Sequence, residues 1–119
     1  MNWYLVKLVY QIICGDGLHT AQFDEQLRII EAVDDIHALS KAQLLGHREQ
    51  ETFYNNKEKL VQWKFIDVSE MNKIDSFFDG AELYSRINEQ DNADSYINMV
   101  QTKAAYLLAQ SSAACLHKN

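Results

Sequence analysis

The chain begins with a long segment in which apolar residues alternate with more polar ones. From residue 4 to residue 14 every even position is apolar, while the odd positions are mixed. A period of two predicts a strand with one dry face. Gly15, Asp16 and Gly17 then give a turn signal, and alternation resumes over residues 23–33, so we expect an antiparallel hairpin. The apolar even positions are Tyr4, Val6, Leu8, Tyr10, Ile12 and Cys14.

A helical pattern follows the hairpin. Asp34 and Asp35 supply an N-cap, and apolar residues then recur at every third position up to Leu45. We expect a helix of about three turns that ends at Gly46, in the positive-φ conformation that favours glycine. Residues 47–58 are mostly polar, and we interpret them as a surface loop that leads to the next strand.

Two further strands are predicted in the second half of the chain. Residues 60–68 alternate in a way that suits an internal strand. An irregular run follows and ends in a turn at Asp79 and Gly80. Residues 81–88 alternate again, which predicts a fourth strand.

The last part of the chain predicts one long helix. Residues 91–115 contain neither Gly nor Pro, and small or apolar residues recur with alternating spacings of four and three. A helix of about 24 residues is about 36 Å long, which exceeds the width of so small a domain. It therefore either crosses the sheet diagonally or extends to pack against another chain. The stripe consists of Ala93, Ile97, Val100, Ala104, Leu107, Ser111 and Ala114.

These elements predict an α+β fold of order β-β-α-β-β-α. We expect a four-stranded, mainly antiparallel sheet with both helices on one face. The chain has 119 residues, 47% of them hydrophobic and 24% charged, which is typical of one globular domain. We expect a single domain over residues 1–119, with a sheet-and-helix core in residues 1–90 and a C-terminal helix and tail in residues 91–119.

The charge balance argues against two classes of partner. Eleven Lys and Arg face seventeen Asp and Glu, so the net charge is −6. An acidic domain lacks the basic surface that binds nucleic acid or an anionic membrane. The first apolar stretch is interrupted by Lys7 and Gln11 and is too short for a membrane span. We therefore expect a cytoplasmic protein that binds neither nucleic acid nor membrane.

Metal or cofactor chemistry has little support in the sequence. Cys14 and Cys115 are single cysteines without metal-ligand spacing, and we interpret them as reduced thiols. A disulfide between them is the alternative. The histidines form no metal motif, no His lies on a predicted position adjacent to Ser85, and no glycine-rich phosphate loop is present. We expect no metal and no cofactor, and the sequence leans against an enzyme.

One group of polar residues is a candidate ligand site. On the predicted strand over residues 81–88, Glu82, Tyr84 and Arg86 are two residues apart and would project from one side of the sheet. A carboxylate, a phenol and a guanidinium there can bind a small anionic or zwitterionic ligand, with Trp63 beside them. The alternative is a solvent-facing strand surface held by cross-strand ion pairs, with Trp63 in the core.

The stripe on the C-terminal helix is the strongest signal for an interaction. Its small residues would let a second helix or a sheet approach closely, and the helix carries more apolar surface than one stripe. We favour a non-catalytic module that forms a homodimer or binds a protein partner through this helix. The alternative is packing of the stripe within its own chain. The candidate interface residues are Ile97, Val100, Ala104 and Leu107.

Several short motifs occur in order along the chain: Trp3-Tyr4-x-Val6-Lys7-Leu8, Ala38-x-x-Lys41-Ala42-x-x-Leu45-Gly46, Tyr54-Asn55, Val61-x-Trp63-Lys64-Phe65-x-x-Val68 and Asp79-Gly80-x-Glu82-x-Tyr84-Ser85-Arg86. Together they resemble a known bacterial family, that of domain of unknown function 4288, over residues 2–88. The resemblance implies a small α+β fold and brings no activity with it. One departure lies at residues 55–58, where we expect a glycine; either Asn56 takes the positive-φ position or the turn is built differently.

Overall fold

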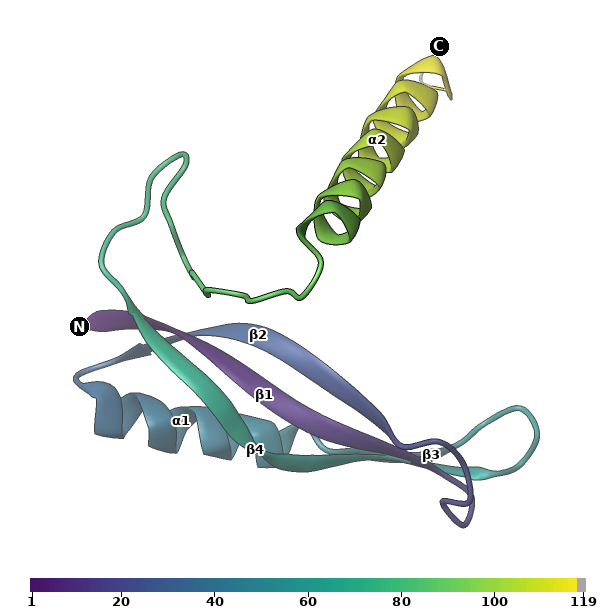
Figure 1. Cartoon of the computed structure of the whole chain (residues 1–119). Helices are drawn as coiled ribbons and strands as arrows, with labels where there is room; N and C mark the ends of the chain where they lie inside the picture. Colours follow the sequence, from purple (N-terminus) through teal and green to yellow (C-terminus); the bar gives the residue numbers. More distant parts are fainter. Residues whose placement is uncertain (118–119) are drawn as a thin grey trace. The chain divides into compact units, whose positions relative to one another are not determined.

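The computed structural model describes the backbone of residues 1–117 and the side chains of residues 1–111. The chain divides into two compact units, Met1–Ser85 and the part that begins at Arg86, and each is described by itself. The first holds a sheet and one helix, and the second holds one long helix (Figure 1). The elements are β1 (Asn2–Cys14), β2 (Gln22–Ala32), α1 (Asp35–Arg48), β3 (Glu51–Tyr54), β4 (Leu60–Ile74) and α2 (Ala93–His117). The predicted α+β class is confirmed, and the elements follow the order β-β-α-β-β-α, although the third and fourth strands do not both lie where they were predicted.

The four strands form one sheet in the order β2-β1-β4-β3, and every neighbouring pair is antiparallel. The predicted hairpin of β1 and β2 is confirmed, with Tyr4 opposite Ile30. The pairing of β1 with β4 contains two bulges, at which Ile66 and Ser69 of β4 have no partner on β1. Bulges increase the local twist of a strand, and the sheet is visibly curled (Figure 1).

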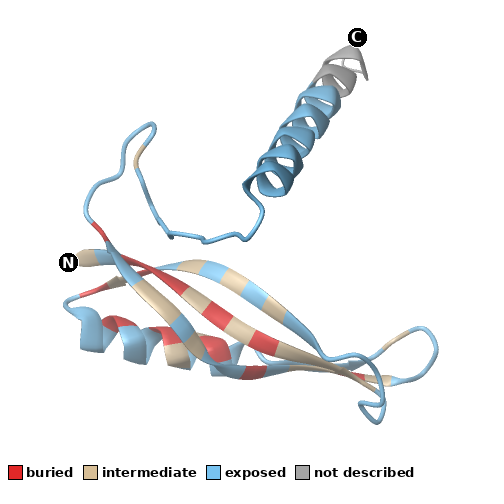
Figure 2. Cartoon of the chain, viewed as in Figure 1, coloured by how far each residue is buried: buried red, intermediate tan, exposed pale blue. Residues whose placement is uncertain are grey.

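The core lies between α1 and one face of the sheet (Figure 2). The even positions of β1 from Tyr4 to Tyr10 are buried there, as their alternation predicted. Full burial of a large apolar side chain contributes about 1.5–3 kcal/mol each, so this layer supplies much of the stability of the unit. The core residues are Tyr4, Val6, Leu8, Tyr10, Ile30, Ala32, Ala38, Ala42 and Phe65.

Helix α1 starts as predicted but ends later than predicted. Asp34 is the N-cap, and its side chain accepts a hydrogen bond of 2.8 Å from the backbone N–H of His37. The prediction that Gly46 ends the helix is wrong, because the helix continues to Arg48 and Glu49 is the C-cap. Gly46 is needed for another reason: a Cβ at this position would collide with the ring of Phe65.

Strand β3 lies in the segment that we predicted to be a loop. It pairs with β4, so that Phe53 lies opposite Val61. All four of its side chains are exposed, so its sequence lacks the alternation of apolar and polar residues that marks a strand with one buried face. In the turn that follows, Glu58 takes the positive φ of 62°, and the side chain of Asn55 accepts hydrogen bonds from two backbone N–H groups. Glu58, and not Asn56, therefore takes the positive-φ position in this turn.

The predicted strand over residues 81–88 is absent, and this prediction is wrong. The segment has no helix or strand, while β4 extends to Ile74 instead of ending at Val68. One place for such a strand, the position beside β1, is already occupied. Trp3 at the start of β1 lies opposite Ile74, and β2 occupies its other edge, so no backbone groups are left for a further strand beside β1.

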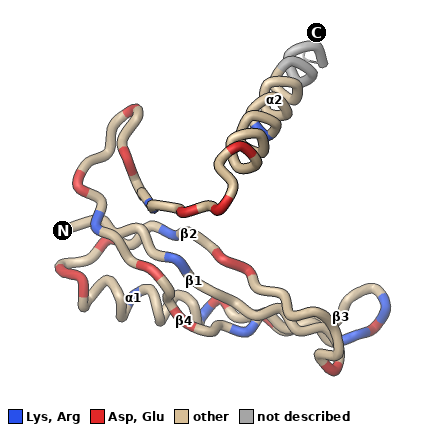
Figure 3. The backbone as a smooth tube through the Cα atoms, viewed as in Figure 1, with Lys and Arg blue, Asp and Glu red and all other residues tan. Residues whose placement is uncertain are grey.

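Helix α2 confirms the predicted long C-terminal helix, with 25 residues. Asn92 caps its start, because the Asn92 side chain accepts a hydrogen bond of 3.0 Å from the backbone N–H of Ser95. Asp94 and Lys103 are the charged residues between positions 93 and 111 (Figure 3). The expected placement of both helices on one face of the sheet stays a prediction for α2. Cys14 is a free thiol in the structure, and the side chain of Cys115 lies outside the described residues.

Candidate functional site

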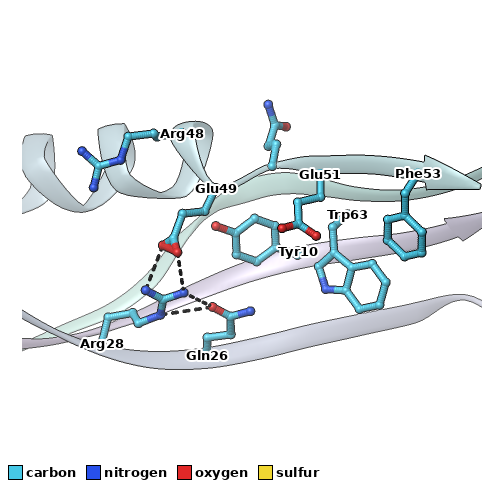
Figure 4. A pocket seen from close by; sticks show the side chains of 9 residues that line it. Tyr10, Gln26, Arg28, Arg48, Glu49, Glu51, Phe53 and Trp63 are labelled. Carbon is cyan, nitrogen blue, oxygen red and sulfur yellow. Dashed lines mark hydrogen bonds and ion pairs between the residues drawn. The ribbon is translucent and has the colours of Figure 1, made fainter.

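The sheet face that α1 covers continues beyond the end of the helix, and a pocket opens there. Its volume is about 530 Å³, which lies in the range of small-molecule sites. Residues of β1, β2, β3, β4 and the C-terminal end of α1 surround it (Figure 4). The lining residues are Tyr10, Gln26, Arg28, Arg48, Glu49, Gln50, Glu51, Phe53 and Trp63.

Three aromatic side chains form one side of this pocket. Glu51 of β3 lies opposite Trp63 of β4, and side chains alternate along a strand, so Glu51 and Phe53 share one face of the sheet. The rings of Phe53 and Trp63 are stacked, with centroids 6.1 Å apart and planes 21° apart. Tyr10 completes the aromatic side from β1. The wall is therefore built by three strands at once.

Tyr10 is held by the end of the helix. Its hydroxyl donates a buried hydrogen bond of 2.9 Å to the carbonyl oxygen of Gly46. This carbonyl lies in the last turn of α1, where backbone acceptors lack a helical partner. Burial raises the pKa of Tyr10 above its usual value of 10.0, with a smaller contribution from the charge of Glu49. The phenol therefore stays protonated at neutral pH and acts as a structural donor.

A chain of hydrogen bonds connects the aromatic side of the pocket to its polar side. The indole N–H of Trp63 donates to a carboxylate oxygen of Asp24 at 3.0 Å, and the amide of Gln26 donates to the same oxygen at 2.6 Å. Arg28 donates to the Gln26 side-chain oxygen at 2.8 Å and to Glu49 at 2.8 Å. β2 is thereby tied both to β4 and to the end of α1.

The ionisable groups of the pocket differ in whether their charge is compensated. Arg28 and Glu49 form an ion pair at 2.8 Å. Glu51 and Arg48 have no ion pair within the part of the chain whose side chains are described. The Glu51 carboxylate lies beside the rings of Tyr10 and Trp63, whereas the Arg48 side chain extends away from them along the helix (Figure 4). The free charge beside the aromatic rings is therefore negative.

Comparison with known proteins identifies the family. A family model described as "Domain of unknown function (DUF4288)" matches residues 3–85, which is more than half of the chain. The chain belongs to the DUF4288 family. The resemblance expected from the motifs is confirmed, and the matched range coincides closely with the first compact unit. A search of curated proteins and a search of solved structures give no match.

The pocket lies wholly inside the DUF4288 region, but only part of the predicted ligand site lies in it. Of the four candidate residues, Trp63 lines the pocket. Glu82, Tyr84 and Arg86 are exposed residues of a segment without a strand, so the expectation that a strand aligns them on one face is wrong. A role of these three residues in binding a ligand stays a prediction without that support.

Sequence reasoning missed most of the pocket. Glu51 and Phe53 lie on β3, which was interpreted as a loop, and Glu49 lies at the end of a helix that was predicted to stop earlier. One signal was available: Phe53 and Tyr54 are adjacent aromatic residues just before a turn and the next strand, which is typical of a short hairpin. The pairing that brings Phe53 to Trp63 is not encoded in any local motif.

The candidate interface residues lie outside the DUF4288 region, on α2. Ile97, Val100, Ala104 and Leu107 are all exposed, and Leu107 exposes 63% of its surface. Further large apolar side chains of the helix are exposed beside this stripe. They are Tyr96, Met99, Tyr106 and Leu108.

The described residues contain no group of three or more His, Cys, Asp or Glu side chains that could hold a metal ion. Among the helices that the structure describes, none is long and apolar enough to cross a membrane.

Proposed function

We propose that the protein is a non-catalytic interaction module that forms a homodimer through α2. The observation that carries this proposal is the exposed apolar surface of α2. Isolated helices in water are marginally stable, and helices in proteins gain most of their stability by packing an apolar face. A helix of 25 residues with so few charged positions therefore needs a surface to pack against.

The spacing of the stripe favours another helix as that surface. Ile97, Val100, Ala104 and Leu107 follow the alternating steps of four and three that place side chains along the seam of a coiled coil. The small side chain of Ala104 allows the backbone of a second helix to come close. A sheet surface would not require this regular spacing.

A second copy of the chain is the simplest source of the partner helix. Helix α1 already packs on the sheet of the first unit, where Ala38, Ala42 and Gly46 are buried. A second α2 brings the same stripe, as a twofold contact requires. Each α2 carries one acidic and one basic residue between positions 93 and 111, so two copies do not repel each other strongly. The proposal keeps the bacterial origin and cytoplasmic location expected from the sequence.

The test is the molecular mass of the full chain in solution, measured by light scattering after size-exclusion chromatography. We expect twice the chain mass of 13.8 kDa at micromolar concentration. Leu107→Glu places a charge in the stripe and should give the monomer mass. Thr102→Glu is the matched control, because residue 102 lies on the opposite side of the helix and should leave the dimer intact. A monomeric wild type, or a Leu107→Glu variant that stays dimeric, contradicts the proposal.

A further inference from the structure

The pocket at the end of α1 combines a free carboxylate with aromatic rings. Arg28 and Glu49 neutralise each other at 2.8 Å, so neither attracts a ligand strongly. Glu51 has no hydrogen bond or ion pair among the side chains that the structure describes, and both of its carboxylate oxygens are available. This carboxylate lies next to Tyr10 and Trp63 (Figure 4). The combination favours a cation, which an aromatic face and a carboxylate both attract.

The indole of Trp63 is prepared for this role by its neighbours. Phe53 stacks against it at 6.1 Å and holds the ring plane in position. On the other side, Asp24 accepts the indole N–H at 3.0 Å. A carboxylate that accepts this hydrogen bond pushes electron density into the ring, because hydrogen-bonded groups polarise one another. The face of Trp63 therefore becomes a better acceptor for a positive charge.

The geometry distinguishes between kinds of cation and disfavours anions beside the aromatic rings. A guanidinium group can donate two parallel N–H groups to a carboxylate while its flat face stacks on an aromatic ring. A quaternary ammonium would use the rings but would leave Glu51 without a hydrogen bond. An anion would be repelled by Glu51, and the uncompensated cation, Arg48, extends away from the rings. We propose that this pocket binds a guanidinium group between the Glu51 carboxylate and the ring of Trp63.

Two sources can supply this chemistry. The volume of about 530 Å³ accommodates a small molecule that carries a guanidinium group, and an arginine side chain of a peptide presents the same group. The site lies in the first unit and does not involve α2, so the inference is independent of the proposed dimer.

The test uses Trp63 as its own reporter. The chain has two tryptophans, so the full-length Trp3→Phe variant leaves Trp63 as the single indole emitter. Titration with agmatine, a small alkylguanidine, should change the emission of Trp63 and reach saturation. A peptide Gly-Arg-Gly forms the second arm. Saturation by either ligand supports the shared guanidinium chemistry, and the tighter of the two identifies the source.

Glu51→Gln provides the decisive variant. Glu51 is exposed, so its substitution should leave the fold intact, which far-ultraviolet circular dichroism can verify. Loss of a charge-assisted pair of hydrogen bonds should weaken agmatine binding about tenfold or more. Glu25→Gln is the matched control, because Glu25 is exposed on β2 and, opposite Val9, lies on the other face of the sheet. It should leave the affinity unchanged.

Several outcomes would overturn the inference. They are the absence of a saturable change with both ligands, an unchanged affinity in Glu51→Gln, choline binding as tightly as agmatine, and a saturable response to inorganic phosphate instead. Repeating the titration with Leu107→Glu added separates this inference from the proposed dimer. The affinity for agmatine should be the same in that variant, whether or not the wild-type chain is a dimer.

Discussion

The ring of Phe65 lies so close to the Cα of Gly46 that no side chain fits between β4 and α1 at this point. Phe65 is 5% exposed and also contacts the ring of Tyr10, with centroids 5.5 Å apart, so it has little room to move. The contact fixes how closely the helix approaches the sheet. It also places the last turn of α1 beside the pocket.

Gly46→Ala should therefore destabilise the protein. Alanine in a helix interior is favoured over glycine by about 1 kcal/mol. An overpacked core costs about 1–3 kcal/mol, and here a Cβ would meet three ring atoms of Phe65. The difference between these two terms is a net loss of up to about 2 kcal/mol in the free energy of unfolding, measured in urea. Ser40→Ala, at an exposed position of the same helix, is the control and should change stability little. A stabilised Gly46→Ala variant would show that the contact is not rigid.

Tyr10→Phe should change the alkaline limit of stability. The folded-state pKa of Tyr10 is raised above 10.0, chiefly by burial, so folding favours the protonated phenol. The contribution of this group is complete below pH 10.0 and is lost as the pH rises through the raised folded-state pKa. The wild type should therefore lose melting temperature between neutral and strongly alkaline pH faster than Tyr10→Phe does. Identical slopes for the two proteins would contradict the assignment.

The same substitution also has a cost at neutral pH. The hydroxyl of Tyr10 is the hydrogen-bond donor to the Gly46 carbonyl, and its removal leaves this acceptor unpaired. An unsatisfied buried polar group costs about 1–3 kcal/mol, so we expect a loss of stability in that range. Urea unfolding at pH 7 measures it, and a change below about 0.5 kcal/mol would indicate that water replaces the phenol.

Asp67 should make the protein lose stability as the pH becomes acidic. The backbone N–H of Val68 lowers the pKa of Asp67 below its usual 3.8, and the Gln43 side chain lowers it further. Its contribution is present above the unfolded-state pKa and is lost as the pH falls through the folded-state pKa. Acid titration followed by circular dichroism should show a steeper loss in the wild type than in Asp67→Asn. Gln43→Ala should give a pH profile that lies between those of the wild type and Asp67→Asn.

The ion pair of Arg28 and Glu49 should add little to stability. The two side chains are 33% and 40% exposed, and a solvated pair at the surface contributes about 0–1 kcal/mol. A double-mutant cycle with Arg28→Met and Glu49→Gln should therefore give a coupling free energy below about 1 kcal/mol. A larger value would mean that the hydrogen bonds through Gln26 strengthen the pair.

The elements that could be predicted from the sequence are those with a strong local pattern. The buried even positions of β1, the N-cap at Asp34 and the long helix α2 all follow directly from local spacing. β3 was missed because a four-residue edge strand with exposed side chains has no such pattern. The alternation over residues 81–88 misled for the opposite reason, since polar and apolar residues also alternate in a segment without a strand.

The candidate site shows the same limit. Trp63 could be singled out as an aromatic residue with a possible ligand role, but its partners come from four separate elements. The contacts of Trp63 with Asp24 and Phe53 depend on strand pairing over 39 and 10 residues of sequence. Such pairing is fixed by the packing of the whole sheet, so no local motif could have predicted it.

The first bulge of β4 moves the core-facing side chains from odd to even positions, and the second bulge moves them back. Before the first bulge, Trp63 and Phe65 lie on the core face of the sheet. Between the two bulges Val68 packs against the core and Asp67 does not, and after the second bulge Met71 packs against the core. Without the bulges, strict alternation would turn Asp67 toward the core and Val68 away from it. Loss of one extra residue alone would invert every later position of the strand. Insertions and deletions in this strand should therefore be tolerated only in compensating pairs.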